Sequence, residues 1–94
     1  MVLTYSGWFA AEGAIEAGAY AAVVDESGTC TLTASSGTLR AAVSIPAVLD
    51  ASTMACPVLQ IPRDRLESGT WHVSATYESA ISAGTSTTVE VLVP

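Results

Sequence analysis

The chain of 94 residues contains no lysine and no asparagine, and only three arginines and one histidine supply basic side chains. Nine acidic residues outnumber them and give a formal net charge of −6. Nucleic acids and anionic membrane surfaces are bound by clustered cations, so this balance argues against both as partners. Lysine and asparagine share AT-rich codons, and their joint absence therefore points to a GC-rich genome.

Long apolar runs are also missing. The longest uncharged segments, Ser27–Leu39 and Ala51–Pro62, fall short of the roughly 18 apolar residues that a membrane span requires, and we expect no membrane insertion. The first eleven residues have no basic start, and Glu12 and Glu16 interrupt the next stretch of apolar residues, which is unlike a signal peptide. An exported protein would therefore be represented by its mature part. The alternative is a cytoplasmic protein that starts at Met1.

Aromatic residues are scarce, and alanine and valine dominate the apolar half of the composition. A core of small side chains suits closely spaced sheets better than bulky helix packing. The length allows one domain, which we assign to residues 1–94. Such a short domain buries only about two-thirds of the surface that its unfolded chain exposes, so a covalent cross-link would add much to its stability.

Turn signals rich in glycine, proline, serine and acidic residues recur about every 8–12 residues, which is typical of a sandwich or barrel. Between these turns, apolar and polar residues alternate along Thr29–Ala34, Leu39–Ile45, Trp71–Glu78 and Val89–Val93. A period of two predicts strands with one buried face. We therefore expect an all-β antiparallel β-sandwich of about seven strands. The charged turn Arg63–Arg65 is expected to cover a sheet edge.

The segment Ala10–Val24 is ambiguous. Its alanine and glutamate content favours a helix, but Gly13 and Gly18 lie inside it and no strong cap precedes it. A turn-like sequence comes after Val24. We interpret Ile15–Val24 as a strand that forms a hairpin with Thr29–Ala34.

Two cysteines, Cys30 and Cys56, lie 26 positions apart. In a small extracellular domain an even cysteine count predicts a disulfide, and two cysteines allow one pairing. Closing a loop of this length stabilises a fold by about 3.5 kcal/mol. The alternative is two buried thiols in a reducing compartment. Two cysteines and one histidine are too few for a structural zinc site, and no C-x-x-C motif is present, so we expect no metal and no cofactor.

Three segments carry a resemblance to a known fold. Leu66–Tyr77, where a glycine turn leads into Trp71 and alternating small residues, resembles the penultimate strand of bacterial immunoglobulin-like and fibronectin-III-like domains. Ser86–Val93, with its T-x-V-x-V run, resembles their last strand. Glu26–Thr33 resembles a strand of the disulfide-bearing versions in secreted proteins of GC-rich bacteria. The resemblance implies an immunoglobulin-like β-sandwich that stands within, or is attached to, a secreted or cell-envelope protein and carries no active site.

Catalytic candidates are few. His72, Ser74 and Glu78 fall on one face of one predicted strand, which suggests a Ser-His-Glu arrangement. Side chains two apart on a strand stand about 6.5–7 Å apart at their bases and point the same way, so they do not converge, and we expect no enzymatic activity. Asp25 and Glu26 lie in a predicted turn without the D-x-D-x-D pattern of a calcium loop, and we interpret them as a solvated turn.

The aromatic residues near the N-terminus support the one binding hypothesis. Exposed tryptophan and tyrosine rings stack on sugar faces, which makes Trp8 and Tyr5 candidate ligand contacts. The alternative is that Trp8 closes one end of a core built from small side chains. The sequence thus favours a non-catalytic structural or interaction module with an unknown protein partner. A carbohydrate-binding module that uses exposed aromatics is the second hypothesis, and a cytoplasmic or hydrolytic protein is the third.

Overall fold

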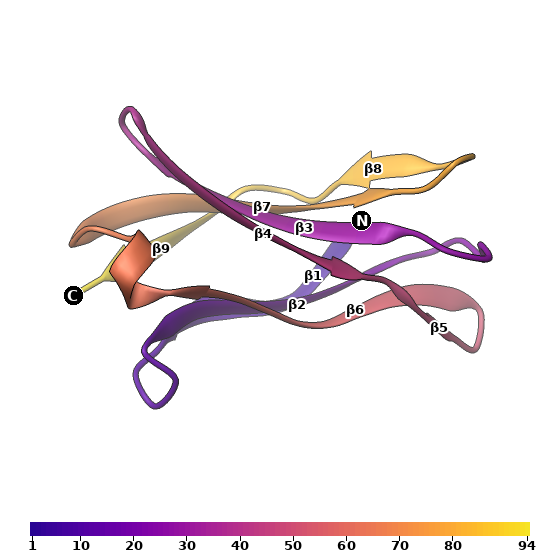
Figure 1. Cartoon of the computed structure of the whole chain (residues 1–94), viewed down its shortest axis with the longest axis horizontal. Helices are drawn as coiled ribbons and strands as arrows, with labels where there is room; N and C mark the ends of the chain where they lie inside the picture. Colours follow the sequence, from indigo (N-terminus) through magenta and orange to yellow (C-terminus); the bar gives the residue numbers. More distant parts are fainter.

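The computed structural model describes residues 1–94 and contains two antiparallel β-sheets packed face to face (Figure 1). The first sheet has the order β1-β2-β6-β5, formed by β1 (Val2–Phe9), β2 (Ala14–Ala21), β6 (Thr53–Pro62) and β5 (Val48–Asp50). The second has the order β4-β3-β7-β8, formed by β4 (Leu39–Pro46), β3 (Thr29–Ser36), β7 (Gly69–Glu78) and β8 (Ala83–Thr85), and β9 (Val89–Val93) also pairs with β7. The prediction of an all-β sandwich is confirmed, with nine strands in place of about seven.

The alternating pattern places small apolar side chains between the sheets. A cluster of 19 buried residues forms the core, and alanine is its most frequent member. Trp71 and Tyr77 on β7 are its largest side chains, and both are almost fully buried. The single helical turn, η1 (Arg63–Arg65), is a 3-10 turn between β6 and β7. No helix in the structure has the length and apolar character needed to cross a bilayer.

Two details of the predicted strands are wrong. Ala14–Ala21 is a strand, but it pairs with β1 and β6 and forms no hairpin with β3. The loop of residues 22–28 instead carries the chain from one sheet to the other (Figure 1). The last strand begins at Val89 and not at Ser86. The Ser86 amide donates to the Ala75 carbonyl at 2.8 Å, but the Ala75 amide donates to the Ser86 hydroxyl at 2.9 Å rather than to a backbone carbonyl, so the strand pairing is irregular there.

A disulfide joins the two sheets at their inner strands. Cys30 on β3 and Cys56 on β6 are bonded, with 6.0 Å between their Cα atoms, and both are fully buried. This confirms the predicted pairing and indicates an oxidising setting outside the cytosol. Each cysteine lies on a strand with neighbours on both sides, so the bond links the centres of the sheets rather than their edges.

Side-chain hydrogen bonds stabilise the end of the sandwich that contains η1. The Trp71 indole Nε1–H donates to the Glu67 carbonyl at 2.8 Å, so the ring is buried and its polar atom is satisfied. Arg63 donates to the carbonyls of Leu66 and Pro94. Arg65 donates to the carbonyl of Ala42 on the edge strand β4 at 2.9 Å. The Arg63–Arg65 turn therefore covers a sheet edge, as predicted, and leaves fewer backbone groups free to pair with another chain.

Candidate functional site

Tyr5 and Trp8 lie on opposite faces of β1. Trp8 pairs with Ile15, a fully buried core residue, and packs partly buried against the core from the inner face. Tyr5 pairs with Gly18 on the outer face and is exposed. The two rings therefore do not form one platform. Both residues remain predicted ligand contacts, but each would have to act alone on its own face of the sheet.

The outer face around Tyr5 combines an aromatic ring with fixed polar groups. The ring covers Gly18, where an added Cβ would overlap its Cε1 atom, and it meets Phe9 edge to face with 5.8 Å between centroids. The Tyr5 hydroxyl donates to Glu16 Oε2 at 2.9 Å, and Gln60 Nε2 donates to Glu16 Oε1 at 2.7 Å. Burial and the bond to Glu16 raise the pKa of Tyr5 above its ordinary value.

The hollowed surface of the molecule lies at the other end from η1. The β2–β3 loop (residues 22–28), the β7–β8 turn (residues 79–82) and the β5–β6 turn all lie at this end, at the right of Figure 1. The largest hollow, about 400 Å³, separates the loop from the β7–β8 turn, and two smaller ones adjoin it. We name this region the loop end. No group of three or more His, Cys, Asp or Glu side chains is placed to share a metal ion.

A buried hydrogen bond ties the β2–β3 loop to β7. The Tyr77 hydroxyl, on the inner face of β7, donates to Asp25 Oδ2 at 2.5 Å. The Tyr77 side chain lies over Gly28, next to Asp25. A Cβ at position 28 would overlap the Tyr77 ring and hydroxyl. Burial, followed by the bond to Asp25, raises the pKa of Tyr77. The glycine thus allows the close approach that brings the loop down onto the core.

Asp25 is the unusual residue of this loop. It is only 8% exposed, although it lies in an irregular segment between exposed neighbours. Its Oδ1 atom is buried and has no hydrogen-bond partner, and no other buried side-chain nitrogen or oxygen is left in that state. A buried carboxylate oxygen without a donor is costly, because it has lost its water and gained nothing in return.

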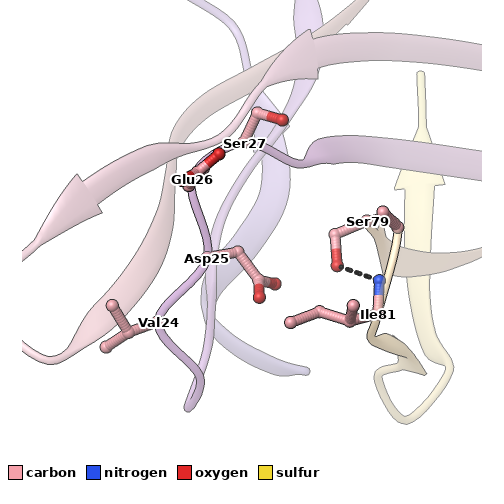
Figure 2. A pocket seen from close by; sticks show the side chains of 7 residues that line it. Val24, Asp25, Glu26, Ser27, Ser79 and Ile81 are labelled. Atoms are coloured by element: carbon pink, nitrogen blue, oxygen red, sulfur yellow. Dashed lines mark hydrogen bonds between the residues drawn. The ribbon is translucent and has the colours of Figure 1, made fainter.

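The opposite wall of the hollow is a turn organised by Ser79. The Ser79 amide donates to the Ser82 carbonyl at 2.8 Å, and the Ser79 Oγ accepts from the amides of Ile81 and Ser82 at 3.3 and 3.0 Å. This serine turn holds Ile81 outward, and its side chain is 81% exposed. In Figure 2 the Asp25 carboxylate points from its loop toward the β7–β8 turn, and the Ile81 side chain lies beside it.

Charge is divided between the two ends of the sandwich. Arg40 is the second residue of β4, beside the β3–β4 hairpin, and Arg63 and Arg65 belong to η1, so all three arginines lie at the end away from the hollow. The loop end carries four of the nine acidic residues and no arginine: Asp25, Glu26, Asp50 and Glu78. Met1 also lies at this end, near Gly84.

Sequence reasoning placed Asp25 and Glu26 in a turn but missed the burial of Asp25. No local pattern predicts this burial, because Asp25 lies in a loop and its partner Tyr77 lies on a strand 52 positions away. Gly28 between them marks a close backbone approach only once that partner is known. His72, Ser74 and Glu78 point outward along β7, in the parallel arrangement that the register predicted. Comparison of the chain with protein-family models, with curated proteins and with solved structures finds no match.

Proposed function

We propose that this chain is a non-catalytic interaction module with an immunoglobulin-like fold, belonging to a secreted or cell-envelope protein of a bacterium, and that it binds a protein partner through its loop end. The observation that carries the proposal is the placement of the hollowed surface. Two connections between strands line it, the β2–β3 loop and the β7–β8 turn, on a frame cross-linked by the disulfide, and binding residues are commonly found on such loops.

The strand order supports the immunoglobulin-like assignment. Immunoglobulin domains place strands A, B, E and D in one sheet and C, F and G in the other, and some add a further strand beside C. The order β1-β2-β6-β5 corresponds to A-B-E-D, and β4-β3-β7 with β8 and β9 corresponds to the second sheet with that extra strand. In this correspondence the loop end presents the B–C and F–G connections, which antibody variable domains use for recognition.

The start of β7 supplies a second similarity and the disulfide a difference. Many immunoglobulin-like domains have a tyrosine near the start of strand F whose hydroxyl bonds the backbone a few residues upstream. Trp71 occupies the equivalent place and donates to the carbonyl of Glu67, four residues earlier. The antibody disulfide, in contrast, joins strands B and F, whereas Cys30 and Cys56 join the equivalents of C and E. The proposed likeness therefore concerns the architecture, not the cross-link.

Several features support a role in binding rather than catalysis. His72 stands on a flat, exposed strand surface, with Ser74 and Glu78 spaced along the same strand rather than aimed at it. The loop end offers instead one buried carboxylate, several hydroxyls and two exposed aliphatic side chains. Such a mixture of aliphatic and polar groups suits contact with a partner's surface, where an apolar centre is surrounded by a polar rim.

A random peptide library displayed on phage tests the proposal. Peptides selected on the wild-type protein should lose binding to Ile81→Ser, which alters the loop end, and keep binding to Leu92→Ser, which alters another highly exposed aliphatic residue, on β9. Folding of both variants is verified by amide dispersion in NMR spectra. Selected peptides that bind both variants as well as the wild type would place the binding surface elsewhere.

A second candidate function is carbohydrate binding at the outer face of the first sheet. The observation in its favour is the exposed Tyr5 ring beside Phe9, with Glu16 and Gln60 held next to it by hydrogen bonds. Affinity electrophoresis in gels that contain soluble polysaccharides tests this idea. Retardation should be lost in Tyr5→Ala and kept in Tyr5→Phe, which retains the ring. Equal mobility of all three proteins in every gel would exclude it.

A further inference from the structure

We propose that the hollow of the loop end receives an arginine or lysine side chain of the protein partner, with Asp25 as the acceptor of its cationic group. This inference rests on the proposed function and adds the chemistry of the partner. It is supported by three independent observations: an acceptor without a donor, an exposed aliphatic side chain beside it, and a local excess of negative charge.

The missing donor is the first observation. Asp25 Oδ2 already accepts from Tyr77, whereas Asp25 Oδ1 is buried and accepts nothing. Asp25 and Ile81 line the same hollow, and the 81% exposed Ile81 side chain has few contacts to hold it in place. Exposed side chains change rotamer within picoseconds to nanoseconds, so an incoming donor can displace this one at small cost. A bound ammonium or guanidinium group would then satisfy Oδ1 with a charge-assisted hydrogen bond.

The walls of the hollow are the second observation. Ile81 is 81% exposed and lies beside the Asp25 carboxylate, and Val24, on the other side of the β2–β3 loop in Figure 2, is also more than half exposed. Ser27 and Ser79 add hydroxyl groups to the lining. Lysine and arginine carry an apolar stem below a charged head. A stem that packs against Ile81 would bury exposed apolar surface on both molecules while its head reaches Asp25. A small inorganic cation would leave these aliphatic walls unused.

Electrostatics is the third observation. The loop end holds four acidic residues and no arginine, in a protein whose three arginines all lie at the opposite end. Like charges in a cleft concentrate oppositely charged groups and speed their association. A divalent cation fits less well, because Ca²⁺ takes six to eight oxygen ligands and no cluster of three acidic or metal-binding side chains is present.

The test is an NMR titration of the ¹⁵N-labelled full chain with N-acetyl-arginine methylamide. Its control ligand is the citrulline counterpart, which has almost the same shape and a neutral urea in place of the guanidinium. The arginine derivative should produce saturable shifts in the amides of residues 24–27 and 79–81, with millimolar affinity. The citrulline derivative should bind about tenfold more weakly or not at all, because a neutral donor makes a weaker bond to a carboxylate. The lysine derivative should behave like the arginine derivative.

Asp25→Asn provides the decisive variant. The asparagine keeps the shape and can still accept from Tyr77, but it removes the charge, and affinity for the arginine derivative should fall about tenfold or more. Asp64→Asn makes the same chemical change in η1, at the opposite end, and should leave the affinity unchanged. If Asp25→Asn does not fold, the affinity of Ile81→Ser for the arginine derivative is measured instead. It should also fall, because the aliphatic contact for the ligand's stem is lost.

Four outcomes would overturn the inference. Equal binding of the arginine and citrulline derivatives would show that charge is not recognised. Shifts that spread over the molecule, or that respond equally to Asp25→Asn and Asp64→Asn, would indicate general attraction to an acidic protein. Calcium chloride that shifts the same amides while the arginine derivative does not would assign the hollow to a metal ion. If peptides from the phage selection depend on the loop end but contain no arginine or lysine, the proposed function stands and this inference fails.

Discussion

Substituting three glycines with alanine tests the packing that positions the loop end. An ideal Cβ added at Gly7 meets only Phe9, at an ordinary 3.8 Å, whereas a Cβ at Gly18 or Gly28 would overlap a tyrosine ring. The latter two glycines differ in the mobility of the ring above them. Tyr5 over Gly18 is exposed and can swing aside, whereas Tyr77 over Gly28 is almost fully buried and tied to Asp25.

The expected free energies of unfolding follow this order. Gly7→Ala should stabilise the fold by about 0.4–1 kcal/mol, because alanine restricts the unfolded chain. Gly18→Ala should gain the same stabilisation from the unfolded chain. It also displaces Tyr5 from its edge-to-face contact with Phe9, which contributes about 0.5–1.5 kcal/mol, so the net change in the free energy of unfolding should be small. Gly28→Ala should cost about 1–3 kcal/mol from overpacking alone. Separation of Tyr77 from Asp25 adds to that cost.

Urea denaturation followed by tryptophan fluorescence measures all three variants, because Trp71 is buried and reports on loss of the core. The comparison of Gly28→Ala with Gly7→Ala removes the general effect of replacing a glycine. A Gly28→Ala protein as stable as Gly7→Ala would refute the reasoning. Tyr77 would then not lie over Gly28, and the burial of Asp25, on which the inference about a basic side chain depends, would be wrong as well.

Four further predictions concern the core, the cross-link and the sheet edge. Intact mass without reductant should be lower by two hydrogens than after reduction of Cys30–Cys56, and reduction should lower the thermal midpoint by roughly 14–28 °C, as a loss of about 3.5 kcal/mol does in a domain of this size. Trp71→Ala should cost about 3–5 kcal/mol and lose its dispersed amide resonances, because the ring is 1% exposed. The pKa of Tyr77 is raised by burial and by its bond to a carboxylate, so the unfolded chain releases the hydroxyl proton at a lower pH than the folded chain. The free energy of unfolding should therefore fall as the pH rises above 10.0, and less steeply in Tyr77→Phe. Arg65→Gln should increase concentration-dependent association in sedimentation velocity, because the carbonyl on edge strand β4 loses its donor.

The periodic parts of the sequence predicted their own structure well. Alternation along Trp71–Glu78 and Thr29–Ala34 placed the correct residues in the core, because a half-buried strand imposes the period of two directly on the side chains. The disulfide was also predictable, since two cysteines in a small β domain allow a single pairing. The fold class needed no more than these local patterns.

Long-range arrangement was not predictable from the same patterns. The turn after Val24 has the composition of a hairpin turn, but residues 22–28 connect strands of different sheets. Glycine and acidic residues serve both kinds of connection, and which one forms is decided by the partner that buries β2, here β6. The candidate site at the loop end depends in the same way on Tyr77, whose distance from Asp25 along the chain hides the contact.

The position of the disulfide has a mechanical consequence. Cys30 and Cys56 lie on interior strands of opposite sheets, so the bond gives a pulled chain a covalent path that bypasses the residues between them. Fully stretched from its two ends, the oxidised chain would extend to about 240 Å, against about 330 Å after reduction. The bypassed part contains β4 and β5 and most of β3, which tension on the termini cannot draw out while the bond is intact. Under load, oxidation would therefore limit how far this module can lengthen and leave a cross-linked remnant from which it can refold.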